Sequence, residues 1–194
     1  MIKAAKQWAA KIVAHLKDIV SAFFDLQEEE SIEEKGKKVA VTTARRVAYA
    51  VADYWLAVLE MVLIVTMKAY GYEFLYIFLA TWAFGVIVAG IFVVIWQRTG
   101  NDLTLGEDYR RAVDVIILQS RFAGMLSIGG VLIKASFWDG PEHIVIFFQK
   151  EIKTEARIAL ALLVLTVSQA ILWTTIYSLG YDSISELVNY FRST

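Results

Sequence analysis

Four long apolar stretches constrain this chain more than any other feature. They cover residues 47–67, 74–96, 112–133 and 158–179. Each is close to the ~20 residues that a helix needs to cross the hydrocarbon core of a bilayer. Apolar residues make up 58% of the chain, above the ~45–50% of a soluble domain. The sequence therefore predicts an all-α integral membrane protein, in which four transmembrane helices form one multi-pass domain over residues 47–179.

Residues 1–28 have the pattern of an amphipathic helix, with lysines and aspartates opposite a broad apolar arc. The arc contains Ile2, Ala5, Trp8, Ala9, Ile12, Leu16, Ile19, Val20, Phe23 and Leu26. An apolar face with a tryptophan and flanking lysines is typical of a helix that lies in the headgroup plane of a bilayer. We therefore predict an N-terminal interfacial helix. The alternative is a helix packed on a partner or on one end of the bundle.

Residues 29–46 form a charged hinge before the first span. Ser31 and Glu34 have the spacing of a capping box, which predicts that a helix begins here and continues into the span. Thr104 and Glu107 have the same spacing before the third span.

The region that leads into the fourth span admits two interpretations. Residues 141–179 form either one continuous helix or a separate interfacial helix with a bend near residues 149–157. Residues 180–194 are predicted to form a short amphipathic C-terminal segment, with Ile184, Leu187, Val188 and Phe191 at helical spacing.

Charged side chains occur within two of the predicted spans. Asp53 and Glu60 are seven residues apart in the first span, and Asp114 and Arg121 are seven apart in the third. Residues at this spacing share a helix face. An arginine can serve two carboxylates, so we expect a buried network in which Arg121 joins the two acidic groups of the first span. Such a network is either a structural strut or the lining of a polar pathway.

Two further features concern the second and fourth spans. Gln169 lies near the middle of the fourth span and needs a polar partner there. Thr81, Gly85 and Ala89 form a stripe of small residues in the second span. Such stripes let membrane helices approach closely, which predicts helix packing.

The distribution of lysine and arginine predicts the orientation. With four spans, residues 1–46, 97–111 and 180–194 would share one side of the membrane, and these segments hold most of the basic residues. Basic residues gather on the cytosolic side. We therefore expect both termini in the cytosol.

Several kinds of chemistry are not expected. The chain has no cysteine and only two histidines, His15 and His143, so neither a metal site nor a cofactor is predicted. No acid–base constellation suggests an enzyme. The net charge of −1 gives no overall attraction for nucleic acid.

The predicted function follows from the intramembrane charges. We expect an oligomeric ion or proton channel, or a small transporter component, with the charged faces of spans one and three at the pathway. Its partners would be the lipid bilayer and either further copies of itself or other membrane subunits. The alternative is a non-catalytic accessory subunit of a larger membrane complex, bound through its amphipathic ends.

Overall fold

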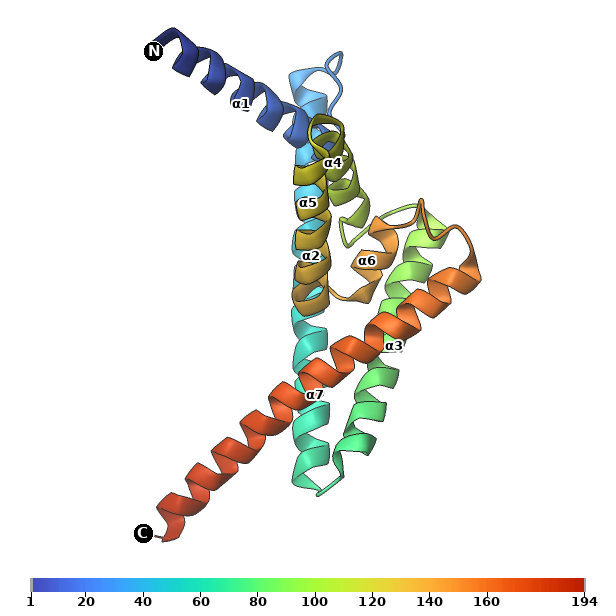
Figure 1. Cartoon of the computed structure of the whole chain (residues 1–194). Coiled ribbons are helices and arrows are strands. Elements are labelled where there is room, and N and C mark those ends of the chain that lie inside the picture. Colours follow the sequence, from blue (N-terminus) through green and yellow to red (C-terminus); the bar gives the residue numbers. More distant parts are fainter. Residues whose placement is uncertain (1, 194) are drawn as a thin grey trace.

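Every regular element among the described residues is a helix, and the helices form an elongated arrangement joined by loops (Figure 1). The computed structural model describes residues 2–193, with side chains for all of them except 2–5, 137, 138, 192 and 193. The elements are α1 (Ile2–Phe23), α2 (Ile32–Ala69), α3 (Phe74–Thr99), α4 (Gly106–Gln119), α5 (Arg121–Lys134), a π-helical turn η1 (Ala135–Asp139), α6 (Pro141–Phe147) and α7 (Glu155–Ser193).

Three helices, α2, α3 and α7, are long and apolar enough to cross a membrane. A short connection containing Gly71 (φ +79°) joins α2 to α3 and makes them antiparallel neighbours, as its length predicts. The helix α7 packs along α3 and crosses α2 (Figure 1). The buried core lies where α3 and α7 meet α6, and it contains Ala89, Val93, Val145 and Leu162.

The prediction of a transmembrane span over residues 112–133 is wrong, because the chain folds back at Ser120. The backbone of Ser120 is extended (φ −154°, ψ 114°), and its side chain accepts a hydrogen bond from the Ala123 N–H. Ser120 thus ends α4 and caps α5, and the two helices pack together as a hairpin. Each has 14 residues, fewer than the ~20 that a crossing requires. The described chain therefore has three candidate spans instead of four.

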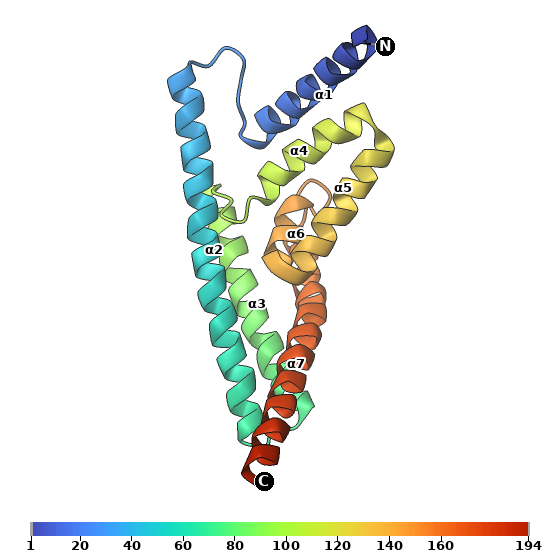
Figure 2. The same ribbon diagram turned by 90° about the vertical axis from the view of Figure 1, so that its left-hand side faces the viewer.

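The structure decides between the two interpretations of residues 141–179. A separate helix, α6, ends at Phe147, and a loop leads to α7, so this region is not one continuous helix. Pro141 occupies the first turn of α6, and all seven of its residues are buried. The short helix lies between α3, α4 and α7 (Figure 2). The helix α6 is therefore buried inside the protein, in contrast to the interfacial helix that was one of the two predictions.

The N-terminal amphipathic helix is present as α1, and it packs against α4 (Figure 2). Arg111 donates a hydrogen bond to the carbonyl of Ala22 at 3.1 Å, and the rings of Phe23 and Tyr109 meet edge to face. These contacts hold the C-terminal end of α1. Trp8 and Leu16 on its outer face remain exposed, so its position at a membrane interface remains a prediction.

The charged region before the first span begins as expected. The capping box between Ser31 and Glu34 is confirmed, since the Ser31 hydroxyl accepts from the Glu34 N–H and the Glu34 carboxylate accepts from the Ser31 N–H. Most of the predicted hinge is therefore the first part of α2. The second predicted box does not form. Asp102 takes its place and accepts from the backbone N–H groups of Thr104 and Glu107.

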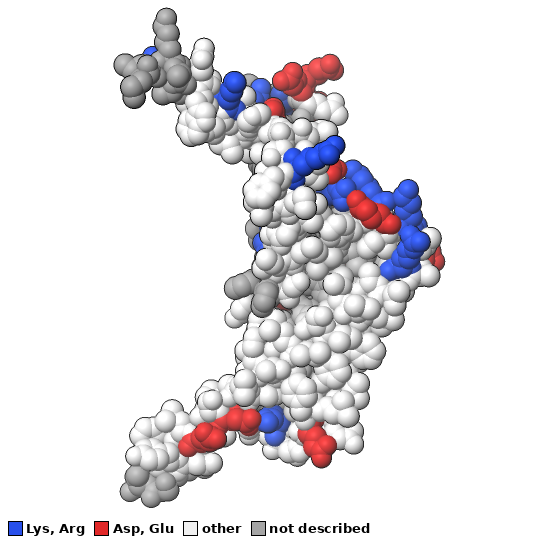
Figure 3. All heavy atoms as spheres, in the orientation of Figure 1, with Lys and Arg blue, Asp and Glu red and all other residues white. Residues whose placement is uncertain are grey.

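The two ends of the chain lie at opposite ends of the molecule (Figure 1). The predicted C-terminal segment is not separate, because α7 continues without a break to Ser193. Figure 3 shows charged side chains gathered at both ends of the visible face, with a wide band of mostly uncharged surface between them. The expectation that both termini are cytosolic was based on four crossings, whereas the described residues contain three candidate spans, so the side on which each terminus lies stays a prediction.

Candidate functional site: an acidic cavity between the candidate spanning helices

A cavity of about 380 Å³ lies among α2, α3 and α7, next to η1 and α6. Four carboxyl groups line it, two from α2 and two from the segment around Pro141. Arg46 is the one basic side chain among its described lining residues. The carboxyl-bearing residues are Asp53, Glu60, Asp139 and Glu142. The cavity therefore has an acidic lining, and α2 contributes to it from Arg46 to Glu60.

Asp53 and Glu60 reach the cavity because their seven-residue spacing places both on one face of α2. Both side chains are half-buried. Neither has a hydrogen bond or an ion pair with another residue in the described part of the chain. Two unpaired carboxyl groups within an apolar helix are costly, so a proton, a cation or water must compensate them.

Asp139 is the opposite case, because two cations hold it. Arg46 donates to its Oδ1 at 3.1 Å, and Lys134 donates to its Oδ2. Its side chain is buried. Burial alone would raise the pKa of Asp139, but the hydrogen bonds from Lys134 and Arg46 lower it below the ordinary value of 3.8. Asp139 therefore keeps its charge and ties η1 to α2 through Arg46.

His143 lies behind this ion pair and belongs to the scaffold. It is buried, its Nδ1 lies 3.0 Å from the carbonyl of Thr104, and its ring packs on Tyr109. A carbonyl only accepts, so the proton is on Nδ1. Burial lowers the pKa of His143, which favours the neutral ring.

Glu142 has no cation beside it. Its exposed fraction is 3%, and Oε1 lies 2.8 Å from the Tyr49 hydroxyl. The backbone N–H of Glu142 also donates to its own carboxyl group. Burial raises the pKa of Glu142 to about 7. The carboxyl group lies against Gly140, where a Cβ would come within 2.6 Å of both of its oxygens. Gly140 also has a φ of +83°, which disfavours any residue other than glycine. Both the contact with Glu142 and the backbone conformation therefore oppose a side chain at this position.

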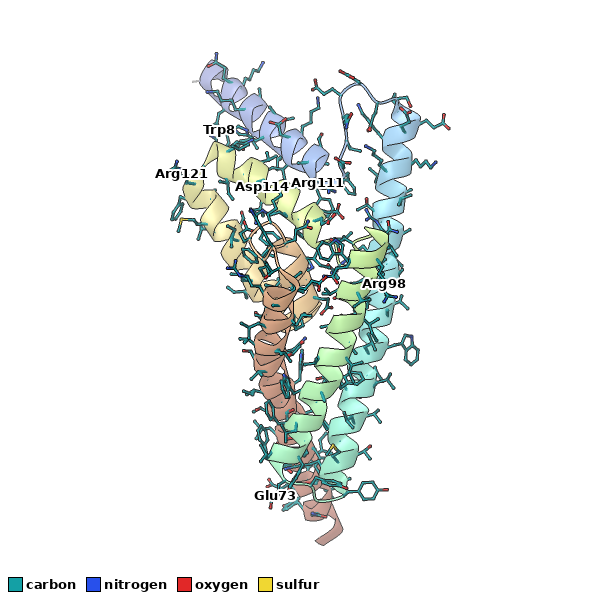
Figure 4. All side chains as sticks on the ribbon, turned by 90° about the vertical axis from the view of Figure 1, so that its right-hand side faces the viewer. Trp8, Glu73, Arg98, Arg111, Asp114 and Arg121 are labelled. Carbon is teal, nitrogen blue, oxygen red and sulfur yellow. The ribbon has the colours of Figure 1, made fainter. Side chains whose placement is uncertain are left out.

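Three of the predicted pathway residues come together at this cavity. Asp53 and Glu60 line it from α2, and Gln169 lines it from α7. The structure separates the other two from them. Arg121 is exposed at the junction of α4 and α5 (Figure 4) and forms no ion pair in the described chain, so the predicted network with Asp53 and Glu60 is absent.

Asp114 belongs to an ion-pair network outside the spanning helices. Its two oxygens accept from Arg110 at 2.8 Å and from Lys150 at 2.9 Å, and Arg110 also pairs with Glu151. Burial alone would raise the pKa of Asp114, but the bonds from Lys150 and Arg110 lower it. This network joins α4 to the loop before α7, and it does not contribute to the cavity.

The stripe of small residues in α3 lies against α7. Thr81 and Ala89 are buried. A Cβ on Gly85 would lie 3.9 Å from Thr166 of α7, and the indole of Trp82 donates to the Thr166 hydroxyl at 3.1 Å. Close packing of α3 on α7 brings Gln169 to the cavity, which Gly85 and Ala89 also line.

The sequence interpretation missed Arg46, Tyr49, Asp139 and Glu142. One signal was available, since two acidic residues flank Pro141 and are followed by the apolar run Ile144–Phe148. Acidic groups next to such a run need buried partners, and Tyr49 and Arg46 supply them from α2.

The chemistry open to this arrangement is that of carboxyl groups. No cluster of three or more side chains suited to holding a metal ion occurs among the described residues. The carboxyl groups can bind protons or attract hydrated cations. No protein-family model, no curated protein and no solved structure matches this chain.

Proposed function

We propose that this chain is a multispanning membrane protein that forms part of an oligomeric ion or proton channel, or of a small transporter. The acidic cavity would be its path for cations or protons. The observation that carries the proposal is the pair Asp53 and Glu60, which face the cavity from a candidate span without a hydrogen bond or ion pair in the described chain. Ionisable groups at such positions are costly and usually mark pathways or proton relays.

The path would need further helices from outside this chain. Three helices are too few to enclose a continuous aqueous pore, and α7 diverges from α2 and α3 toward its C-terminal end (Figure 1). We therefore expect a homo-oligomer, or an assembly with other membrane subunits, in which neighbours complete the wall of the cavity.

The distribution of basic residues favours one orientation. Of the 19 lysines and arginines, all but Lys68 and Arg192 belong to segments at the end where α2 begins. This asymmetry is greater than the one that four spans would give. By the positive-inside rule, the N-terminus and the α4–α5 hairpin would be cytosolic and the C-terminus would be on the other side.

The alternative function is that of a non-catalytic accessory subunit. The chain exposes 12827 Å², whereas scaling predicts about 9,300 Å² for a compact soluble monomer of this mass. Large apolar side chains are exposed on α1 and α5, outside the candidate spans. They include Trp8, Val13, Leu16, Phe122, Met125 and Leu126. Such a surface is typical of a protein that binds a partner.

A flux assay on the purified full-length protein in liposomes tests the proposal. Proton flux would be measured with an internal pH dye, and potassium and sodium uptake would be measured separately. We expect flux in the wild type and a strong reduction in Asp53→Asn and Glu60→Gln. The matched control is Glu186→Gln, which removes an exposed carboxylate from α7 outside the cavity.

The outcomes separate the two functions. Flux that depends on Asp53 and Glu60 but not on Glu186 supports the pathway. Wild-type liposomes that pass none of these ions would overturn it and favour the accessory subunit. Flux that is unchanged in both cavity variants would also reject the cavity as the path.

A further inference from the structure

Tyr49 stands between two hydrogen-bond acceptors. Its hydroxyl lies 2.8 Å from Oε1 of Glu142 and also within hydrogen-bonding distance of the backbone carbonyl of Asp139. A tyrosine hydroxyl has one proton, so it can donate to only one of them. Glu142 and Asp139, which carry the two acceptors, are each 3% exposed, so bulk water does not readily satisfy the other.

All three groups have a hydrogen-bond partner if Glu142 is protonated. Its carboxyl O–H then donates to the Tyr49 hydroxyl oxygen, and the Tyr49 O–H donates to the carbonyl of Asp139. Each of the three groups has a partner in this arrangement. With an ionised Glu142, the Tyr49 proton can point to the carboxylate, which leaves the Asp139 carbonyl without it. It can instead point to the carbonyl, which leaves the Tyr49 oxygen and Oε1 of Glu142 2.8 Å apart with no proton between them. Both arrangements are costly in a buried position. Among the described side-chain bonds and the backbone bonds outside helices, no other donor reaches the Asp139 carbonyl.

We propose that Glu142 is a proton-binding site, and that the bound proton links α6 to α2 through Tyr49 and the Asp139 carbonyl. The ligand is a single proton. Its loss turns the Tyr49 hydroxyl toward the carboxylate and releases the carbonyl. Protonation of Glu142 therefore lets Tyr49 of α2 bind both α6 and the Asp139 carbonyl of η1, whereas the ionised form keeps only the bond to α6.

The groups around Glu142 favour the neutral acid. No lysine or arginine forms an ion pair with it among the described residues, and Arg46 and Lys134 are bound to Asp139. The elements packed on α6 contribute apolar side chains from α3 and an amide from α7. The titratable and charged side chains that line the cavity with Glu142, or that act on α6, are Arg46, Tyr49, Asp53, Tyr54 and Glu60 of α2, Asp102 before α4, Tyr109 and Arg110 of α4, Lys134 of α5, Asp139 of η1, His143 of α6 and Tyr177 of α7.

The hydrogen bonds of Tyr49 matter because α6 and η1, which they join to α2, form one boundary of the acidic cavity. Gly140 and Pro141 line the cavity beside Glu142. A negative charge on Glu142 adds to those of Asp53 and Asp139 nearby and repels them. Rising pH therefore weakens the attachment of this boundary to α2. The site shares the cavity of the proposed function, but binding of the proton does not depend on transport.

Infrared spectroscopy of the full-length protein in lipid tests the proposal, because the carbonyl stretch of a carboxyl group is present only when the group is protonated. Spectra would be recorded from about pH 5 to about pH 9, on either side of the neutral range. We expect a band that titrates near neutral pH and disappears in Glu142→Gln. Glu155→Gln, which removes an exposed carboxylate from α7, should leave the band unchanged.

Tyr49→Phe gives a second, independent reading. Removing the hydroxyl takes away the one side-chain donor to ionised Glu142, so the titration midpoint of the band should rise by about one pH unit. A midpoint that does not move would overturn the role of Tyr49. A band that titrates identically in Glu142→Gln and in the wild type would overturn the site. Both readings are independent of flux, so an inactive protein can still support this proposal.

Discussion

Gly124 of α5 lies so close to Ile117 of α4 that a Cβ on Gly124 would come within 2.3 Å of Cγ1 and 3.0 Å of Cα of the isoleucine. This contact sits next to the turn at Ser120 and allows the two helices to pack as a hairpin. A side chain at position 124 cannot be accommodated by a simple rotation, because one of the atoms it would meet belongs to the backbone.

Replacing Gly124 with alanine should therefore destabilise the hairpin. We expect a loss of about 1–3 kcal/mol, the usual range for overpacking a tight contact. The measurement is thermal or denaturant unfolding in detergent, together with protease sensitivity at residues 118–122. Gly129→Ala is the matched control, because a Cβ added at position 129 of the same helix would meet no neighbouring atom within 4 Å outside its own helix backbone. It should raise stability by about 0.5–1 kcal/mol. Equal effects of the two substitutions would contradict the tight contact.

The sequence was sufficient to predict the helical class, the amphipathic first helix and the three helices that are long and apolar enough to cross a membrane. It failed at residues 112–133 because a hydropathy window measures only average apolarity. It does not detect a single extended residue, Ser120, between two 14-residue helices. The polar face of α4, with Arg110 and Asp114, argued against a membrane span. In the structure these two residues pair with the loop before α7.

Half of the site could also be anticipated. Periodicity placed Asp53 and Glu60 on one face, and depth placed Gln169 near the middle of its helix; all three line the cavity. Glu142 and Tyr49 are 93 residues apart. Their contact depends on a buried seven-residue helix that no hydropathy pattern reveals, so long-range packing decided this half of the site.

Arg121 and Glu60 should behave as independent positions. Because Arg121 is exposed and has no ion pair in the described chain, Arg121→Gln should change the free energy of unfolding by no more than about 0.5 kcal/mol. The double variant with Glu60→Gln should equal the sum of the single variants. A double-mutant cycle in detergent measures this. A coupling energy above about 1 kcal/mol would contradict this independence and support the predicted network between Arg121 and Glu60.

Asp139→Asn should remove stability that depends on Arg46 and Lys134. Leaving two partly exposed cations without their buried partner should cost about 2–4 kcal/mol at neutral pH. The pKa of Asp139 is lowered in the folded state, so the unfolded chain binds more protons and stability rises with pH. This contribution is present above pH 3.8 and is lost as the pH falls below it. Unfolding measured across the acid range should show a smaller decline in Asp139→Asn than in the wild type.

Glu142 should give the opposite slope. Its pKa rises from 4.5 to about 7 on folding, so between these values the folded protein binds more protons than the unfolded chain. Stability should therefore fall as the pH rises through this window, by about 3 kcal/mol in total for this group. Glu142→Gln should lack this decline, whereas Glu155→Gln should retain it. Parallel curves for wild type and Glu142→Gln would contradict the buried, protonated state.

The topology of the chain can be tested directly, because a protein without cysteine accepts single reporter cysteines at chosen positions. Three crossings place Gln27 on one side of the membrane, and Tyr72 and Ser193 on the other. The positive-inside rule makes the side of Gln27 cytosolic. In intact cells or oriented vesicles, an impermeant thiol reagent applied from outside should therefore label Tyr72→Cys and Ser193→Cys but not Gln27→Cys. The arrangement with both termini in the cytosol predicts instead that Ser193→Cys is protected. Labelling of Tyr72→Cys alone would therefore reject a complete crossing by α7, and labelling of Gln27→Cys alone would reverse the orientation.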